Sequence, residues 1–451
     1  MPPRGPASGA AVGVVSLGCP KNLVDTEVML GLLQQAGFAV VADPEQADVM
    51  LVNTCCFIAP AREEAAAALS EAIAWKQAGR ARAVICAGCW PQYALADLTV
   101  QYPQVDAFMG PDDVPRVVSV VQQAMAGPVE PRAITCPPRY LYDHTTPRLR
   151  ATPPWTAYLK IAEGCSHRCS FCTIPRLRGR YRCRSLSSAV QEAEELAAEG
   201  VIEVNLVAQD TTAYRDPDTG AEIADLLAAL GRGDGLRWVR LLYGFPSRVS
   251  KRMIDVIAGE PTICKYLDLP FQHADREVLQ RMRRPGDGER YLRLMADLGA
   301  AMPDIALRST FLVGFPGETE QAFRRLLDFL QAAQLDRVGA FCFSPEPGTP
   351  AADMPDQVPS EVAQERFHQL MALQQPISLA RNQRWVGRTL EVLIEARGRK
   401  PGEWVGRSFR DAPEVDGVVV VSSRRRLELG HLVPVNICLA QPYDLAGAPD
   451  R

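Results

Sequence analysis

Residues 157–172 read AYLKIAEGCSHRCSFC. The first part, Ala157–Ala162, is mostly apolar and is typical of a buried strand. Three cysteines follow it closely, Cys165, Cys169 and Cys172, in the pattern CxxxCxxC. Thiolates spaced in this way can hold a metal cluster from a single loop. This stretch therefore predicts a sheet with a metal centre just past the end of one strand.

The number of thiols favours an iron–sulfur cluster. A cubane 4Fe–4S cluster takes four ligands, so three cysteines leave one iron open. An open iron can bind the amino and carboxylate groups of S-adenosylmethionine, and Phe171 is expected to shield the cluster or face the adenine. The alternative is structural zinc, which takes four ligands, usually as two separated pairs. His167 is the nearby fourth candidate, but its place between two of the cysteines is sterically poor.

Strand-like and helix-like segments alternate after this stretch, which predicts βα units. Further strands are expected at Glu203–Ala208, Trp238–Tyr243, Tyr266–Leu269, Ala306–Thr310 and Arg337–Phe343. About six such units without an eightfold count predict a partial (β/α) barrel over residues 153–378. Gly314 and Gly317 lie in GFPGE after one of these strands, where they would let the backbone approach a cofactor at the rim. A plain Gly-Pro turn is the alternative.

Residues 11–125 show the same alternation and are predicted to form an open parallel α/β domain. Its strands are expected at Val12–Leu17, Val49–Asn53 and Ala83–Ala87. Cys19, Cys55 and Cys89 each follow one of these strands. Because ligands bind at the carboxyl ends of parallel strands, the three thiols are expected to converge on a second metal cluster. Three unrelated core cysteines are the alternative.

The other cysteines are harder to assign. Cys56 is expected to point away from its neighbour Cys55, and Cys86 to be packed inside its strand. Cys136, Cys264, Cys342 and Cys438 are expected to be small buried hydrophobic residues. The chain has 13 cysteines in 451 residues, and no secretion signal is evident. We therefore expect a cytoplasmic location, where cysteine clusters bind metal more often than they form disulfides.

The remaining segments complete the domain plan. Residues 126–152 are rich in proline and are expected to be a linker. Residues 381–445 are expected to form a small all-β barrel, with strands at Thr389–Glu395, Val418–Val421 and Val433–Cys438. The net charge of −4 gives no indication of bulk nucleic-acid binding. No apolar run approaches the roughly 20 residues that span a bilayer.

Nearly the whole chain resembles the methylthiotransferase branch of the radical-SAM superfamily. The resemblance rests on domain order and on long matching stretches: SLGCPKN at 16–22, NTC at 53–55, AGC at 87–89, EGCSHRCSFC at 163–172, LVAQDTT at 206–212 and YLDLPFQH at 266–273. It implies an N-terminal domain with three cluster cysteines, a radical-SAM barrel and a C-terminal TRAM barrel. It also implies two 4Fe–4S clusters, and S-adenosylmethionine bound at Cys165, Cys169 and Cys172.

Two groups of this branch differ in substrate. RimO-type enzymes methylthiolate the β-carbon of an aspartate in small-subunit ribosomal protein twelve, whereas MiaB-type enzymes modify an adenosine beside the tRNA anticodon. The RimO pattern is resembled by three stretches: SLGCPKN, CSHRCSFC and GRSFRDAPE at 406–414. The pair His167-Arg168, between two cluster cysteines, favours the protein substrate. The chain departs from that pattern at Ser166, at Cys56 and in Cys183-Arg184-Ser185. None of these departures removes a cluster ligand. A redox or sulfur-handling role of Cys183 stays open beside a plain exchange of serine for cysteine.

The resemblance also implies how the chemistry is divided. The central cluster would reductively cleave S-adenosylmethionine, and the resulting radical would take hydrogen from an unactivated carbon, which acid–base catalysis cannot do. The cluster of Cys19, Cys55 and Cys89 would carry the sulfur that becomes the methylthio group, so the first domain should cap the barrel rim. A sulfur donor and an electron donor are then needed. The competing class is a zinc-stabilised RNA-binding protein with a TRAM module.

Overall fold

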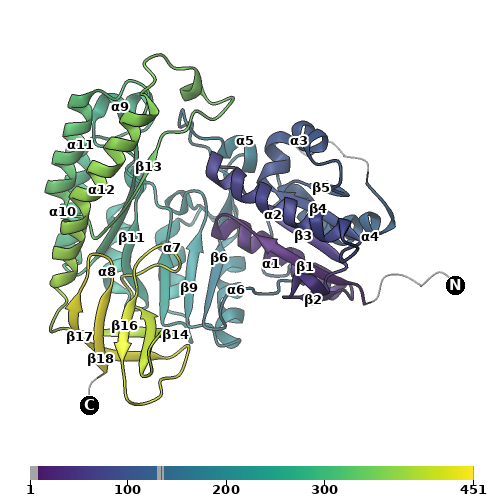
Figure 1. Ribbon diagram of the computed structural model, residues 1–451. Coiled ribbons are helices and arrows are strands. Elements are labelled where there is room, and N and C mark those ends of the chain that lie inside the picture. The colour runs from purple at the N-terminus through teal and green to yellow at the C-terminus, as the bar shows by residue number, and fades with distance from the viewer. Residues whose placement is uncertain (1–8, 130–133, 135–136, 450–451) are drawn as a thin grey trace.

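The computed structural model describes residues 9–129, 134 and 137–449. An N-terminal sheet domain lies beside a larger barrel-like domain, and a small β-barrel lies at the other end of that domain (Figure 1). Among the described residues no helix is both long and apolar enough to span a bilayer. Cys136, expected to be a core residue, lies outside the described residues.

The N-terminal domain is a five-stranded parallel sheet in the order β2-β1-β3-β4-β5. Its strands are β1 Ala11–Ser16, β2 Ala39–Val41, β3 Val49–Thr54, β4 Ala83–Gly88 and β5 Ala107–Met109. Its helices are α1 Pro20–Gln35, α2 Ala59–Gln77, α3 Cys89–Gln101 and α4 Val117–Ala126. Every residue of β3 and β4 is buried, as expected for central strands covered on both faces. The open parallel α/β prediction is confirmed, although β2, β5, α3 and α4 were not predicted.

The central domain is a six-stranded parallel sheet in the order β13-β12-β11-β10-β9-β6. Its strands are β6 Thr156–Lys160, β9 Glu203–Val207, β10 Trp238–Leu241, β11 Ile263–Asp268, β12 Ala306–Val313 and β13 Arg337–Cys342. The sheet remains open between β13 and β6, so the predicted partial barrel is confirmed. The cysteine loop lies inside a short antiparallel hairpin, β7 Ala162–Glu163 with β8 Arg182–Cys183.

Helices cover the outside of this sheet (Figure 1). They are α6 Leu186–Ala198, α7 Ile223–Gly231, α8 Lys251–Gly259, α9 Arg276–Arg281, α10 Gly288–Ala301, α11 Glu320–Ala333 and α12 Ser360–Gln383. The short helix α5 Ile174–Arg178 follows the cysteine loop and contacts α3 of the N-terminal domain. The side chains of Ser185, Ser250 and Thr319 cap the first backbone N–H groups of α6, α8 and α11. Such caps fix where each helix starts, and therefore how long the preceding loop is. Single-turn 3-10 helices occur at Pro44–Gln46, Thr211–Ala213, Pro246–Arg248 and Pro350–Asp353, with a longer one at Pro111–Arg116.

The C-terminal domain is a closed barrel in the order β14-β15-β16-β18-β17. Its strands are β14 Thr389–Arg397, β15 Glu403–Arg407, β16 Val419–Ser422, β17 Leu432–Ala440 and β18 Leu445–Pro449. The small all-β barrel is confirmed, but the sequence indicated only three of its strands. Cys438 was expected to be buried, and this is wrong. The side chains of β17 alternate between inside and outside, and Cys438 faces outward next to buried Ile437.

The stretch GRSFRDAPE closes the end of the central domain opposite the cysteine loop. Arg240 of β10 donates a hydrogen bond from Nη1 to the carbonyl oxygen of Phe409, at 2.6 Å. Arg407 reaches Glu203 of β9 at 2.5 Å, and Arg337 of β13 binds Asp411 at 2.9 Å. All these charged groups are buried. The stretch therefore docks the C-terminal barrel on the N-terminal ends of the strands.

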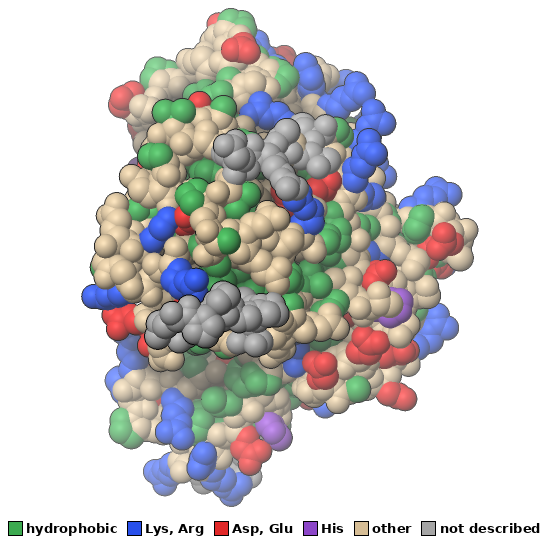
Figure 2. Space-filling model, turned by 90° about the vertical axis from the view of Figure 1, so that its right-hand side faces the viewer, with side chains coloured by type: hydrophobic (Ala, Val, Ile, Leu, Met, Phe, Trp, Pro, Cys, Tyr) green, Lys and Arg blue, Asp and Glu red, His purple; other side chains and the backbone are tan. Residues whose placement is uncertain are grey.

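The N-terminal domain packs against the β6 side of the central domain. A buried ion pair between Asp25 of α1 and Lys160 of β6 and a partly exposed one between Arg62 of α2 and Glu346 link the two domains. Segment 137–152 crosses between them, and Arg148 binds Glu27 on one side at 2.5 Å and Glu192 on the other at 2.7 Å. The outer face of the N-terminal domain carries basic and acidic side chains with hydrophobic ones between them (Figure 2).

Candidate functional site

Cys19, Cys55 and Cys89 lie at neighbouring strand ends of the N-terminal sheet. Cys19 is the N-cap of α1, Cys55 follows β3 directly, and Cys89 is the first residue of α3. A Cβ atom added to Gly18 would lie 3.0 Å from Cys55 Sγ, so only glycine fits between these two turns. The thiol of Cys56 donates to the carbonyl oxygen of Cys89 at 3.2 Å, so the turns that follow β3 and β4 are also in contact.

The surroundings of this triplet suit anionic sulfur. Burial raises the pKa of Cys55, and the backbone N–H groups of Phe57 and Cys56 oppose that rise. Burial raises the pKa of Cys89 to about 12, and the charge of Arg178 opposes that rise. A buried thiol in such surroundings is neutral when alone and becomes an anionic ligand when a metal is present.

The second triplet lies in the loop between β7 and β8. Cys165 is buried, and Cys169 and Cys172 are partly exposed. Burial raises the pKa of Cys165 to about 11 and that of Cys172 to about 12. The backbone N–H group of His167 opposes the rise at Cys165, and that of Ile174 opposes the rise at Cys172. The loop thus places backbone N–H groups where they favour the anionic form of two of its three thiols.

His167 is engaged elsewhere. Its Nε2 lies 2.7 Å from Oδ2 of buried Asp210, and its ring stacks on Phe245 with centroids 3.9 Å apart. Asp210 follows β9 and also binds the N–H of Ala213 and the hydroxyl of Thr212. The structure therefore gives His167 a role in fixing the shape of the loop. Among the described residues, no three His, Cys, Asp or Glu side chains are arranged to hold a single metal ion.

Phe171 connects the cysteine loop to the glycine turn. Its ring meets the edge of Phe315 with centroids 6.3 Å apart. Gly314 has φ +73°, and a Cβ atom there would lie 2.4 Å from Cβ of Ala363. Gly317 has φ +77°, and a Cβ atom there would lie 2.2 Å from Arg281. The backbone turn and the packing of α12 and Arg281 thus already require both glycines.

An arginine lies beside each cysteine triplet. Arg284 is buried, lies over the ring of Phe245 at 4.2 Å and approaches Cys169 Sγ at 3.7 Å. Arg178, the last residue of α5, donates from Nε to Cys89 Sγ at 3.3 Å. Positive charge near clustered thiolates offsets their repulsion.

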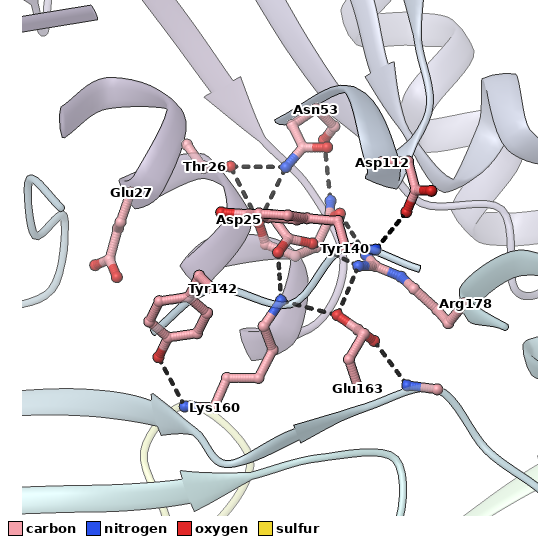
Figure 3. Close-up of polar contacts among 12 residues, drawn as sticks. Asp25, Thr26, Glu27, Asn53, Asp112, Tyr140, Tyr142, Lys160, Glu163 and Arg178 are labelled. Atoms are coloured by element: carbon pink, nitrogen blue, oxygen red, sulfur yellow. Dashed lines mark hydrogen bonds and ion pairs between the residues drawn. The ribbon is translucent and has the colours of Figure 1, made fainter. Parts of the chain in front are cut away.

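Buried charged side chains of the two domains meet around Lys160 and Arg178 (Figure 3). Lys160 Nζ pairs with Asp25 and lies 2.8 Å from Glu163 Oε2. Arg178 Nη1 lies 2.5 Å from Asp25 Oδ2 and 3.2 Å from Glu163 Oε2. Burial by itself would raise the pKa of Glu163, but the charges of Lys160 and Arg178 outweigh it and hold that pKa well below its usual value. We call Asp25, Lys160, Glu163 and Arg178 the interdomain charge cluster.

Sequence reasoning missed the interdomain charge cluster and Arg284. One signal was present, because Lys160 lies within the apolar run Ala157–Ala162 and Glu163 directly follows it, and a charge in such a place needs a buried partner. Nothing in the sequence indicates that Asp25 and Arg178 are those partners.

The other cysteines also have definite positions. Cys86 is fully buried inside β4, as predicted. Cys264 is buried, as expected, whereas the expectation that Cys342 is buried is wrong, because its position near the end of β13 leaves it partly exposed. Cys56 is buried and donates from its thiol to the carbonyl oxygen of Cys89 at 3.2 Å. Cys183 accepts a hydrogen bond from the N–H of Arg215 at 3.3 Å.

A cavity of about 310 Å³ lies away from the cysteines, between the central domain and the small barrel. Its lining includes Arg308, Arg337, Asp416 and Tyr443. Arg308 binds Asp416 at 3.3 Å, and the other arginine binds Asp411, so these charges are already paired. The cavity therefore has no direct part in the cysteine sites.

Family models match each of the three domains. The radical SAM superfamily matches residues 159–330, and the TRAM domain matches residues 386–449. Residues 11–110 match a model described as uncharacterized protein family UPF0004.

Solved structures share the fold at low sequence identity. The radical S-adenosylmethionine methyltransferase TsrM from Kitasatospora setae aligns with a TM-score of 0.56 and 16% identity, over 94% of this chain and 84% of that one. The cobalamin-dependent radical enzyme OxsB aligns with a TM-score of 0.51 and 11% identity, over 81% of this chain and 56% of that one.

Curated relatives are much more similar and match over almost their full length. The ribosomal protein uS12 methylthiotransferase RimO of Heliobacterium modesticaldum is 48% identical, over 97% of this chain and 94% of the relative. The enzymes of the same name from Desulforamulus reducens and Pelotomaculum thermopropionicum are 44% and 47% identical, each over 97% of this chain and 99% of the relative. With this identity and coverage, the chain belongs to the RimO family of radical-SAM methylthiotransferases.

Proposed function

We propose that this chain adds a methylthio group to the β-carbon of an aspartate in ribosomal protein uS12. Family membership supports the reaction class and the substrate protein. The structural observation that carries the proposal is the contact between the two cysteine-bearing domains at Arg178, which binds Cys89 of the N-terminal triplet and Glu163 just before the central triplet. An enzyme that makes a C–S bond needs a radical source and a sulfur source close together. The central triplet would hold the first and the N-terminal triplet the second.

The donor sets fit two 4Fe–4S clusters. Cys165, Cys169 and Cys172 would hold one, and Cys19, Cys55 and Cys89 the other, since each triplet leaves one iron open. When bound, the first supplies an electron to S-adenosylmethionine and the second carries the sulfur to be transferred. The arginines that donate to Cys89 and Cys169, together with backbone N–H groups that favour the anionic thiols, are what clustered anionic sulfur requires.

The protein's own residues would fix the geometry of the reaction. His167, held by Asp210 and Phe245, would keep the cysteine loop in one conformation. Phe171 with Phe315 would exclude water on the side of the glycine turn. Phe171, Gly314 and Gly317 would border S-adenosylmethionine at the rim of the sheet.

Three further assignments belong to this proposal. The reaction takes a sulfur donor and an electron donor, because neither the sulfur nor the electron comes from the substrate. A ribosomal substrate places the enzyme in the cytoplasm. The tRNA adenosine, the substrate of the related MiaB-type group, is the alternative that an experiment must distinguish.

Mass spectrometry of uS12 and of tRNA from a strain lacking this chain tests the substrate. We expect the methylthio group to be lost from uS12, to return with the wild-type gene, and not to return with a Cys19→Ala, Cys55→Ala, Cys89→Ala variant. Loss from tRNA instead would overturn the protein substrate. Anaerobic reconstitution should give about eight irons per chain, and about four would overturn the two-cluster assignment.

A further inference from the structure

Arg178 is the one member of the interdomain charge cluster that touches a cysteine of the N-terminal triplet. Its Nε donates to Cys89 Sγ at 3.3 Å, and its Nη2 donates to Asn22 Oδ1 at 2.9 Å. Its Nη1 faces Asp25 at 2.5 Å and Glu163 at 3.2 Å. One guanidinium group from the central domain thus engages three residues of the N-terminal domain and one of its own.

The surroundings of Arg178 are closed to water. Its side chain is 2% exposed, as is that of Lys160, and Asp25 and Glu163 are nearly as buried. Two cations and two carboxylates in this cluster balance each other. Any negative charge gained at the N-terminal triplet is therefore felt at Arg178 with little screening.

Arg178 is also close in the sequence to the cysteines of the central triplet. Arg178 lies six positions after Cys172 in the same loop region, and Glu163, which it contacts, lies two positions before Cys165. Its own carbonyl oxygen accepts a hydrogen bond from Arg182 of β8 at 2.9 Å. A shift of α5 would move Arg178 relative to both cysteine sets.

We propose that Arg178 is a positioning residue that fastens the N-terminal triplet to the cysteine loop of the central domain and raises the reduction potential of the metal centre at Cys19, Cys55 and Cys89. This inference rests on the proposed function, since it presumes a cluster at that triplet. A reduced cluster carries one more negative charge than an oxidised one. A buried cation and an N–H donor to sulfur favour the reduced form, and their removal should lower the potential.

The geometry explains why lysine would be a poor replacement. The guanidinium fork presents donors in several directions at once, and here it uses three of its nitrogen atoms on four partners. A lysine ammonium would keep the charge but could not reach Cys89, Asn22 and Asp25 together. The charge and the hydrogen bond to sulfur can thus be separated by comparing two substitutions.

The test is a redox titration of the N-terminal centre followed by electron paramagnetic resonance. The full chain carries Cys165→Ala, Cys169→Ala and Cys172→Ala, so only the N-terminal centre can give a signal. In this background Arg178→Gln should shift the midpoint potential to more negative values, and Arg178→Lys should shift it less. An unchanged potential in both variants would overturn the proposal, and if Arg178→Gln fails to fold, the Arg178→Lys result decides alone.

Arg184→Gln is the matched control. Arg184 is equally buried, but its side-chain hydrogen bonds go to Ser188, Glu192 and the carbonyl oxygen of Lys160 and not to a cysteine of either triplet. The Arg184→Gln variant should lower stability without moving the midpoint potential. A shift as large as that of Arg178→Gln would show that loss of any buried arginine changes the potential.

Iron is counted first in the otherwise wild-type chain. A chain that binds one cluster refutes the proposed function, whereas two clusters with an unchanged potential refute only this inference.

Discussion

Nε2 of His167 lies 2.7 Å from Oδ2 of Asp210, so the histidine between the first two cysteines of the central triplet binds a carboxylate. The stacked ring of Phe245 fixes the imidazole from its face. The loop is therefore fixed by a contact to Asp210, three residues past β9, that uses none of its three thiols.

His167→Ala should leave the iron content of the reconstituted protein close to that of the wild type, because the imidazole contacts Asp210. Cleavage of S-adenosylmethionine should fall, since the loop loses its support. The measurements are iron per chain and the 5′-deoxyadenosine formed. Loss of metal as complete as in Cys169→Ala would instead make the histidine a ligand, as the zinc hypothesis requires.

Lys160→Met should destabilise the protein by about 3–5 kcal/mol, because Asp25 and Glu163 would be left buried with one cation fewer. Urea denaturation followed by circular dichroism measures this, and hydrogen exchange of α1 should rise. The control is Lys251→Met, whose side chain is 87% exposed and paired one turn away with Asp255. That change should cost less than about 1 kcal/mol, and equal losses in the two variants would argue against the cluster as a domain fastener.

Glu203→Gln should weaken the docking of the C-terminal barrel in a pH-dependent way. Burial would raise the pKa of Glu203, but the charges of Arg407 and Arg240 hold it at about 2, below the ordinary value of 4.5. A lowered folded-state pKa stabilises the fold above pH 4.5, and that stabilisation is lost as the pH falls toward 2.

The free energy of unfolding should accordingly be about 3–5 kcal/mol lower in Glu203→Gln than in the wild type at pH 7. This difference should shrink as the pH is lowered below 4.5. Urea titrations of both proteins at a series of pH values measure it. A difference that stays constant with pH would show that Glu203 does not act through its charge.

Gly314→Ala should destabilise the central domain by about 1–3 kcal/mol, because residue 314 has positive φ and its Cβ would overlap Ala363 of α12. Gly339→Ala is the control, since the nearest atom to a Cβ there is Arg308 Nη2 at 3.6 Å. That variant should differ from the wild type by less than about 1 kcal/mol. Thermal unfolding measures both, and equal stability of the two variants would remove the packing reason for this glycine.

The main elements of the fold were readable because their signals are local. The buried strands of a parallel sheet are short apolar runs, and six of these in the central domain are visible in the chain. Short strands at sheet edges carry weaker signals, so β2 and β5, with three residues each, were missed. Cys438 was assigned to the core by residue type, but strand alternation puts it outside.

The sequence by itself determined the order of the domains, the two cysteine triplets and the edge of each sheet where the thiols gather. These follow from periodicity and spacing within a few residues of each cysteine. Only the tertiary structure decided how the two triplets are joined. Asp25 is more than a hundred positions away from both Lys160 and Arg178 in the sequence. Folding brings these three side chains into one buried contact, where each lies beside its counter-charge. A buried charge requires a counter-charge but does not say where along the chain that counter-charge is.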